Sequence, residues 1–60
     1  MHVKFYAEPC EAVPSRWQVV ADHGDGRTFL LESGLTKQRA LASVRLAERA
    51  ALFCGATVIA

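Results

Sequence analysis

The chain has 60 residues, of which 52% are hydrophobic and 22% are charged. This length is close to the lower limit for a self-sufficient core, so we expect one domain, residues 1–60. Seven Lys and Arg residues against six Asp and Glu leave a formal net charge of +1, which excludes a general attraction to nucleic acid or anionic lipid. No apolar stretch approaches a membrane span and no charged leader precedes an apolar signal core, so we expect a cytoplasmic protein without a membrane partner.

The first third of the chain predicts two strands separated by a long loop. Residues 2–7 and residues 16–22 each alternate apolar and polar side chains, which is the pattern of half-buried strands. Residues 8–15 lie between them and contain Pro9 and Pro14, which cannot donate to a ladder. We therefore expect regular pairing to stop at Ala7 and to resume at Arg16.

A glycine-rich turn and a third strand follow. Residues 22–26 combine Asp and Gly, which supply the positive φ values of a tight reversal, and residues 27–32 are predicted as a strand that ends at Ser33 and Gly34. For Phe29 to share a face with Trp17, paired residue numbers must sum to an even value, which requires an odd number of loop residues. The sequence therefore predicts a loop of three or five residues.

Residues 37–53 predict one long helix, because they contain neither Gly nor Pro and consist mainly of strong helix formers. Thr36 is placed to cap its first turn and Gly55 to end it. Phe5, Trp17 and Phe29 are expected to fill the space between the sheet and a stripe of small helix residues, which comprises Ala40, Val44, Ala47 and Ala51.

The tail, residues 56–60, is consistent with a short last strand or with an extended segment on the core. The predicted fold is therefore α+β. It has a small antiparallel three-stranded sheet, with or without a short fourth C-terminal strand, packed against one long helix in the order β-β-β-α(-β).

The predicted helix is apolar on more than one side, and such a helix is normally covered on more than one side. Cover could come from the C-terminal tail or from a second copy of the chain. Because association is a common way for very small domains to bury surface, we expect a homodimer that acts as a non-enzymatic protein-interaction module. The candidate interface residues are Leu46, Phe53 and Ala42 on the helix, and Val20 and Leu30 beside Tyr6 on the outer face of the sheet.

Candidate catalytic and metal-binding residues are few. His2 lies beside the chain terminus, and His23 lies in the glycine turn, where a solvated loop histidine is the simpler interpretation. Cys10 and Cys54 match neither a CxxC motif nor a zinc spacing, so we expect free thiols, with a long-range disulfide as the alternative for an exported protein. We expect no enzymatic activity, no cofactor and no bound metal.

One resemblance suggests a different function. The chain is similar to the N-terminal arm-binding domains of tyrosine recombinases and their AP2-like relatives in three features, which are Trp17-x-Val19, a turn with Gly24 and Gly26, and Leu35-Thr36-Lys37-x-x-Ala40. The similarity covers residues 16–48. It implies three strands backed by one helix, a sequence-tolerant DNA-binding module, and Arg16, Gln18 and Arg27 at positions that face DNA. Strands of that family typically carry more Lys and Arg than this chain does.

Overall fold

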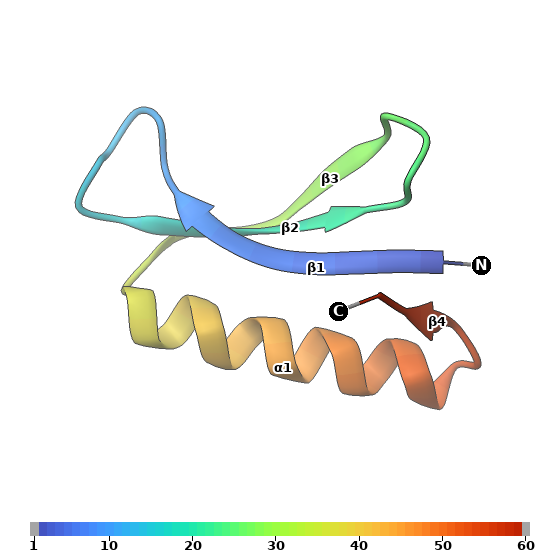
Figure 1. The fold of residues 1–60 in the computed structure, drawn as a ribbon. Helices are drawn as coiled ribbons and strands as arrows, with labels where there is room; N and C mark the ends of the chain where they lie inside the picture. Colours follow the sequence, from blue (N-terminus) through green and yellow to red (C-terminus); the bar gives the residue numbers. More distant parts are fainter. Residues whose placement is uncertain (1, 60) are drawn as a thin grey trace.

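The computed structural model describes residues 2–59. Its elements in chain order are β1 (His2–Pro9), β2 (Trp17–Asp22), β3 (Thr28–Leu35), α1 (Lys37–Phe53) and β4 (Thr57–Val58). The strands form one sheet in the order β3-β2-β1-β4, and α1 lies against one face of it (Figure 1). The predicted α+β class and the predicted helix bounds are confirmed, and the fourth strand forms.

The sheet is mixed, because β1, β2 and β3 pair antiparallel in sequence whereas β4 pairs parallel to β1. Directly opposed residues of antiparallel strands point to the same face. Phe5, Ala21 and Phe29 are opposed across the three strands on the side of α1, which we call the helix face. Tyr6 and Leu30 flank Val20 in the same way on the opposite side, which we call the outer face.

The β2–β3 loop has five residues, 23–27, which confirms the predicted odd number. The His23 N–H donates to the Arg27 carbonyl oxygen over 3.1 Å, and an Asp22 carboxylate oxygen accepts from the Gly24 N–H over 2.8 Å. Gly24 and Gly26 have φ values of +88° and +83°, in the left-handed region that glycine adopts without a steric penalty. The register of β2 and β3 therefore starts from the pair Asp22 and Thr28.

Two strands are longer than the sequence predicted. β1 continues past Ala7 to Pro9, which pairs with Trp17. Proline is tolerated there because β4 pairs only with residues at the other end of β1, so this end is a sheet edge. β3 does not end at Ser33 but continues through Gly34 (φ +72°) to Leu35, because the ladder absorbs extra residues in two register shifts instead of breaking.

Both helix ends are capped by the predicted residues. The Thr36 hydroxyl accepts from the Arg39 N–H over 3.2 Å. At the other end, Gly55 has a φ of +86°, its N–H donates to the Leu52 oxygen, and the Ala56 N–H donates to the Ala51 oxygen. This pair of bonds is a Schellman motif, and it turns the chain back toward β4.

The core consists of small side chains. The buried residues are Val3, Val19, Val20, Ala21 and Ala40. The rest of the predicted helix stripe is half-buried on the sheet side, as expected. The expectation that Phe29 fills the core is wrong, because its side chain is 52% exposed at the strand farthest from the helix axis, whereas Phe5 and Trp17 are half-buried.

Val19, the largest side chain that is fully buried, should dominate the stability of this core. Replacing Val19 with Ala should lower the free energy of unfolding by about 2 kcal/mol, since two buried methyl groups and their packing are lost. Replacing the exposed loop residue Val13 with Ala should change it by less than about 0.5 kcal/mol. Urea denaturation measures both values, and equal effects would contradict this assignment of the core.

Candidate functional site

The chain exposes more surface than a compact monomer of its mass. Its accessible surface is 4444 Å² for 6.5 kDa, whereas a monomer of this mass typically exposes about 3,800 Å². The molecule is a flat slab of 34 × 23 × 15 Å with a sheet layer and a helix layer. The excess of about 600 Å² approaches the roughly 800 Å² that each partner buries in a standard protein interface.

Three of the exposed large apolar side chains among the described residues, Phe29, Leu30 and Leu31, belong to β3. α1 passes beneath β1 and β2, while β3 diverges from it toward the β2–β3 loop (Figure 1). Phe29 is therefore uncovered, and Leu31 is 47% exposed. Leu30 pairs with Val20 and Glu32 pairs with Val19, so Leu31 is an extra residue in β3, and such a bulge bends the strand.

An open groove of about 240 Å³ separates β3 from α1. Its walls are Glu32 and Leu35 from β3 and Arg39, Ala42, Ser43 and Leu46 from α1. One hydrogen bond spans the groove, in which the Ser43 hydroxyl donates to Glu32 Oε1 over 2.7 Å. Two of the predicted interface residues, Ala42 and Leu46, therefore lie on the flank of the helix that faces β3.

Leu46 is 64% exposed, and Phe53, seven residues or almost two turns later on the same flank, is 93% exposed. We call Phe29, Leu31, Leu46 and Phe53 the apolar flank. Sequence reasoning identified its helix half from the helical periodicity. It missed Phe29 and Leu31, because an alternating strand pattern does not show where along the sheet the helix stops covering it.

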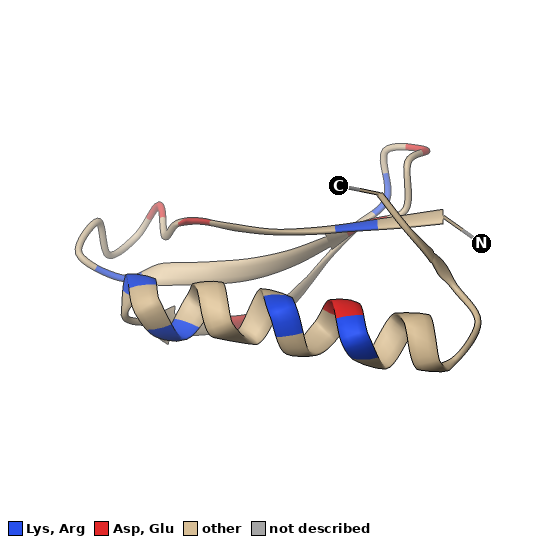
Figure 2. Cartoon of the chain, turned by 60° about the horizontal axis from the view of Figure 1, so that its bottom comes forward, with Lys and Arg blue, Asp and Glu red and all other residues tan. Residues whose placement is uncertain are grey.

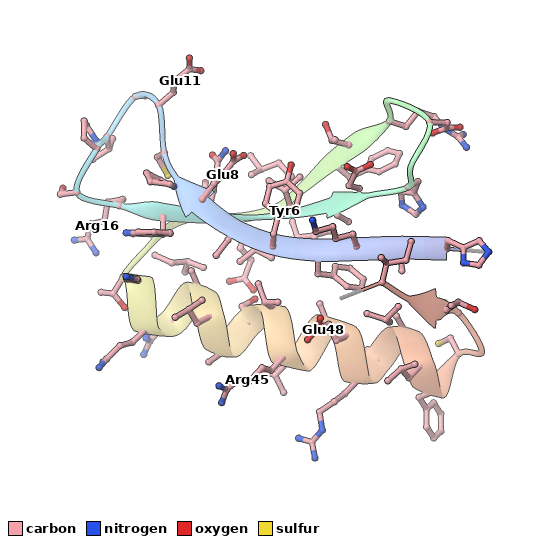
Figure 3. All side chains as sticks on the ribbon, in the orientation of Figure 1. Tyr6, Glu8, Glu11, Arg16, Arg45 and Glu48 are labelled. Atoms are coloured by element: carbon pink, nitrogen blue, oxygen red, sulfur yellow. The ribbon has the colours of Figure 1, made fainter. Side chains whose placement is uncertain are left out.

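The outer face carries the other predicted interface residues, and one of them is placed differently. Val20 is only 5% exposed, because Tyr6 and Leu30 oppose it from both neighbouring strands. Leu30 remains exposed at the free edge, and Figure 3 shows Tyr6 and Glu8 on the side of the sheet away from α1. Val20 therefore supports this face from within and offers almost no contact area of its own.

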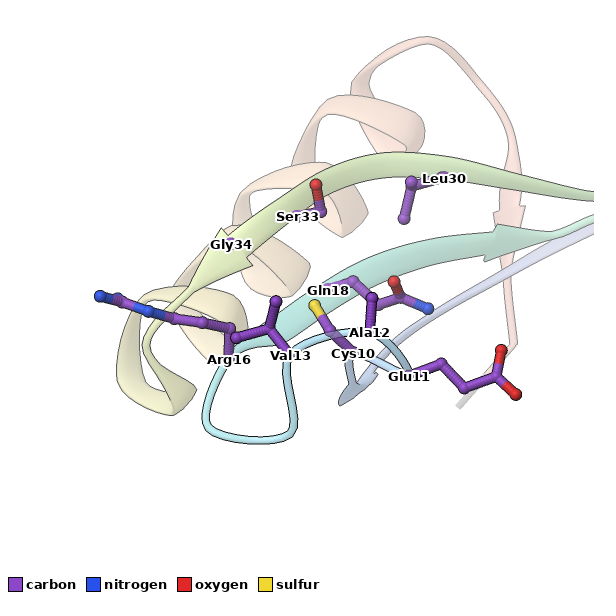
Figure 4. Close-up of a pocket in the computed structure, with 9 residues that line it drawn as sticks. All are labelled: Cys10, Glu11, Ala12, Val13, Arg16, Gln18, Leu30, Ser33 and Gly34. Atoms are coloured by element: carbon purple, nitrogen blue, oxygen red, sulfur yellow. The ribbon is translucent and has the colours of Figure 1, made fainter.

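A second hollow, of about 400 Å³, opens on the outer face between the β1–β2 loop and β3 (Figure 4). It brings together Arg16, Gln18 and Leu30, which the sequence assigned to two different functions, with the half-buried thiol of Cys10. Gln18 Nε2 donates to Glu8 Oε1 over 2.9 Å. Cys10 and Cys54 are free thiols, as predicted. The path of the loop across the sheet leaves no signal in the sequence, so this hollow was not predicted.

The residues proposed to contact nucleic acid do not gather in one place. Arg16 precedes β2 and Arg27 follows the loop at its far end, so the length of β2, roughly 20 Å, separates them. Arg27 forms an ion pair with Asp25, with 2.9 Å between Arg27 Nη2 and Asp25 Oδ2. Because Gln18 is bonded to an acidic side chain, this arrangement does not favour an anionic ligand on the outer face.

Charge is divided between the two layers of the fold. The helix contains four of the seven basic residues, Lys37, Arg39, Arg45 and Arg49, against the single acid Glu48 (Figure 2). The strands and loops contain the other five acids and three bases. Arg45 points away from the sheet (Figure 3), and Lys37 Nζ lies 5.4 Å from the centre of the Trp17 ring, a cation–π contact.

Among residues 2–59, no group of three or more His, Cys, Asp or Glu side chains is arranged to hold a metal ion. Within the same residues, no helix combines the length and the hydropathy needed to cross a membrane. Models of known protein families, curated proteins and solved structures give no match to this chain. We therefore infer the function from the surface of the molecule.

The Arg27 guanidinium holds the pKa of Asp25 below its ordinary value of 3.8, because its hydrogen bonds favour the ionised carboxylate. Replacing Arg27 with Gln should raise the Asp25 pKa toward that value in an NMR titration of the carboxyl carbon. A lowered pKa stabilises the fold above the unfolded pKa, so this contribution should fade as the pH falls below 3.8. An unchanged Asp25 pKa in the variant would contradict the assigned cause.

Proposed function

We propose that the protein is a small, non-enzymatic protein-interaction module that works as a homodimer. The observation that carries this proposal is the apolar flank, four large side chains of β3 and α1 that are each about half exposed or more. Large exposed apolar side chains in such number on a small protein favour an interaction surface. Here it coincides with a core whose largest fully buried side chain is a valine.

The amount of exposed surface supports a second copy as the partner. If each chain buries its excess, the interface totals about 1,200 Å², the lower end of the range for specific interfaces. A two-fold dimer uses the same patch on both copies, so one apolar flank suffices to build it. Association would add apolar burial to a chain whose own core is small.

The arrangement of the candidate catalytic groups supports a non-enzymatic function. His23 packs edge-on against the Phe29 ring, with 5.2 Å between ring centres, at the far end of β2 from the hollow that contains Cys10. The nine residues that line this hollow include no histidine. Nucleophilic catalysis by cysteine generally uses an imidazole base beside the thiol. Among the residues described, the Cys10 thiol has no such base in this hollow.

The homodimer can be tested with matched helix variants. Replacing Leu46 and Phe53 together with Gln should convert a particle of twice 6.5 kDa into one of 6.5 kDa at micromolar concentration, because both side chains belong to the apolar flank. Replacing Leu41 and Leu52 with Gln changes two exposed residues on the other flank of the same helix and should leave the dimer intact. Sedimentation equilibrium measures the mass, and far-UV circular dichroism checks that each variant is folded.

Two results would overturn the proposal. The first is a 6.5 kDa particle for the unmodified chain across the micromolar range. The second is a folded variant with Gln at residues 46 and 53 that remains as dimeric as the unmodified chain.

A further inference from the structure

The two edges of the sheet are very different. β4 forms one edge with two residues, and the Ile59 N–H extends it by one bond to the Val3 oxygen. β3 forms the other edge with eight residues and, within the described chain, has a strand neighbour on one side only. Proteins usually shorten, charge or cover such an edge, because its unpaired backbone groups are a template for another strand. Residues 28–31 of β3 carry no charge and include three large apolar side chains.

The register shows which backbone groups of β3 face outward. The His23 N–H donates to the Arg27 oxygen, so residues 23 and 27 form a hydrogen-bonded pair. Hydrogen-bonded and non-hydrogen-bonded pairs alternate along an antiparallel ladder. Phe29 therefore bonds to Ala21, whereas the N–H and C=O groups of Thr28 and Leu30 point to the free edge. Regular pairing ends after Leu30, where the register shifts.

We infer that β3 pairs antiparallel with β3 of a second copy about a two-fold axis at Phe29, an inference that rests on the proposed homodimer. This register places Thr28 opposite Leu30 of the partner subunit and Leu30 opposite Thr28 of the partner subunit. Thr28 and Leu30 are the residues of the regular part of β3 whose N–H and C=O groups face the free edge. The two symmetric pairs satisfy all of these groups. The two sheets join into one continuous sheet of eight strands with both helices on the same face.

Side chains on the helix face fit the same register. Phe29 meets Phe29 of the partner subunit as a non-hydrogen-bonded pair, for which Cα atoms lie about 4.5 Å apart and side chains are in close contact. Leu31 of each copy lies two residues further along the strand, and Leu46 lines the groove between β3 and α1.

A proline at Leu30 tests the pairing directly. The Leu30 N–H faces the free edge, so proline removes no ladder bond within the chain but removes two symmetric bonds between copies. Leu30→Pro should reduce the mass from twice 6.5 kDa to 6.5 kDa in sedimentation equilibrium. Leu30→Ala keeps the N–H and removes the same exposed side chain, so this matched control should remain dimeric. Circular dichroism verifies that both variants are folded.

Cysteine cross-linking provides a second readout that does not depend on the proline variant. In a chain with Cys10 and Cys54 replaced by Ser, Phe29→Cys should form a covalent dimer under mild oxidation, because the predicted Cα separation suits a disulfide. Ile59→Cys in the same background places a thiol of similar exposure at the opposite edge and should remain mainly monomeric.

The possible failures are distinguishable. Two results would overturn the strand pairing and leave the homodimer standing. One is a folded Leu30→Pro variant that remains dimeric. The other is a Phe29→Cys variant that forms no more disulfide-linked dimer than the Ile59→Cys variant. If Leu30→Pro does not fold, the cross-linking comparison alone decides. A monomeric unmodified chain would overturn the homodimer and the pairing together.

Discussion

One helix cannot cover a sheet of four strands. An α-helix with its side chains is about 10 Å wide, and strands are spaced about 4.8 Å apart, so a helix covers about two of them. In this fold α1 covers β1 and β2, and the short strand β4 with its tail closes the far side. β3 is left with one face and one edge open, and its exposed apolar side chains, the groove beside it and its unpaired backbone follow from that single mismatch.

The parts of the fold that depend on local residues could be predicted from the sequence. The helix bounds follow from the absence of Gly and Pro in residues 37–53 and from the caps at Thr36 and Gly55, which act within a few residues. The odd number of residues in the β2–β3 loop follows from a parity argument that needs only the apolar face of each strand. The exposed helix residues Leu46 and Phe53 follow from helical periodicity in the same way.

The parts that depend on lateral position could not be predicted. Periodicity indicates which face of β3 carries Phe29 but not whether the helix reaches that far across the sheet. The burial of Val20 depends on which residues oppose it in both neighbouring strands, and therefore on the full register. A glycine such as Gly34 is compatible with a strand end or with a bulge, and only the pairing distinguishes the two.

The most direct test of this account is amide hydrogen exchange at Thr28 and Leu30, followed as the protein concentration is raised. In the single chain both N–H groups face the free edge of β3, and in the paired form both are hydrogen-bonded. The account predicts that exchange at these two residues slows with concentration, while the exposed loop amide of Glu11 is unaffected. Rapid, concentration-independent exchange at both residues would contradict it.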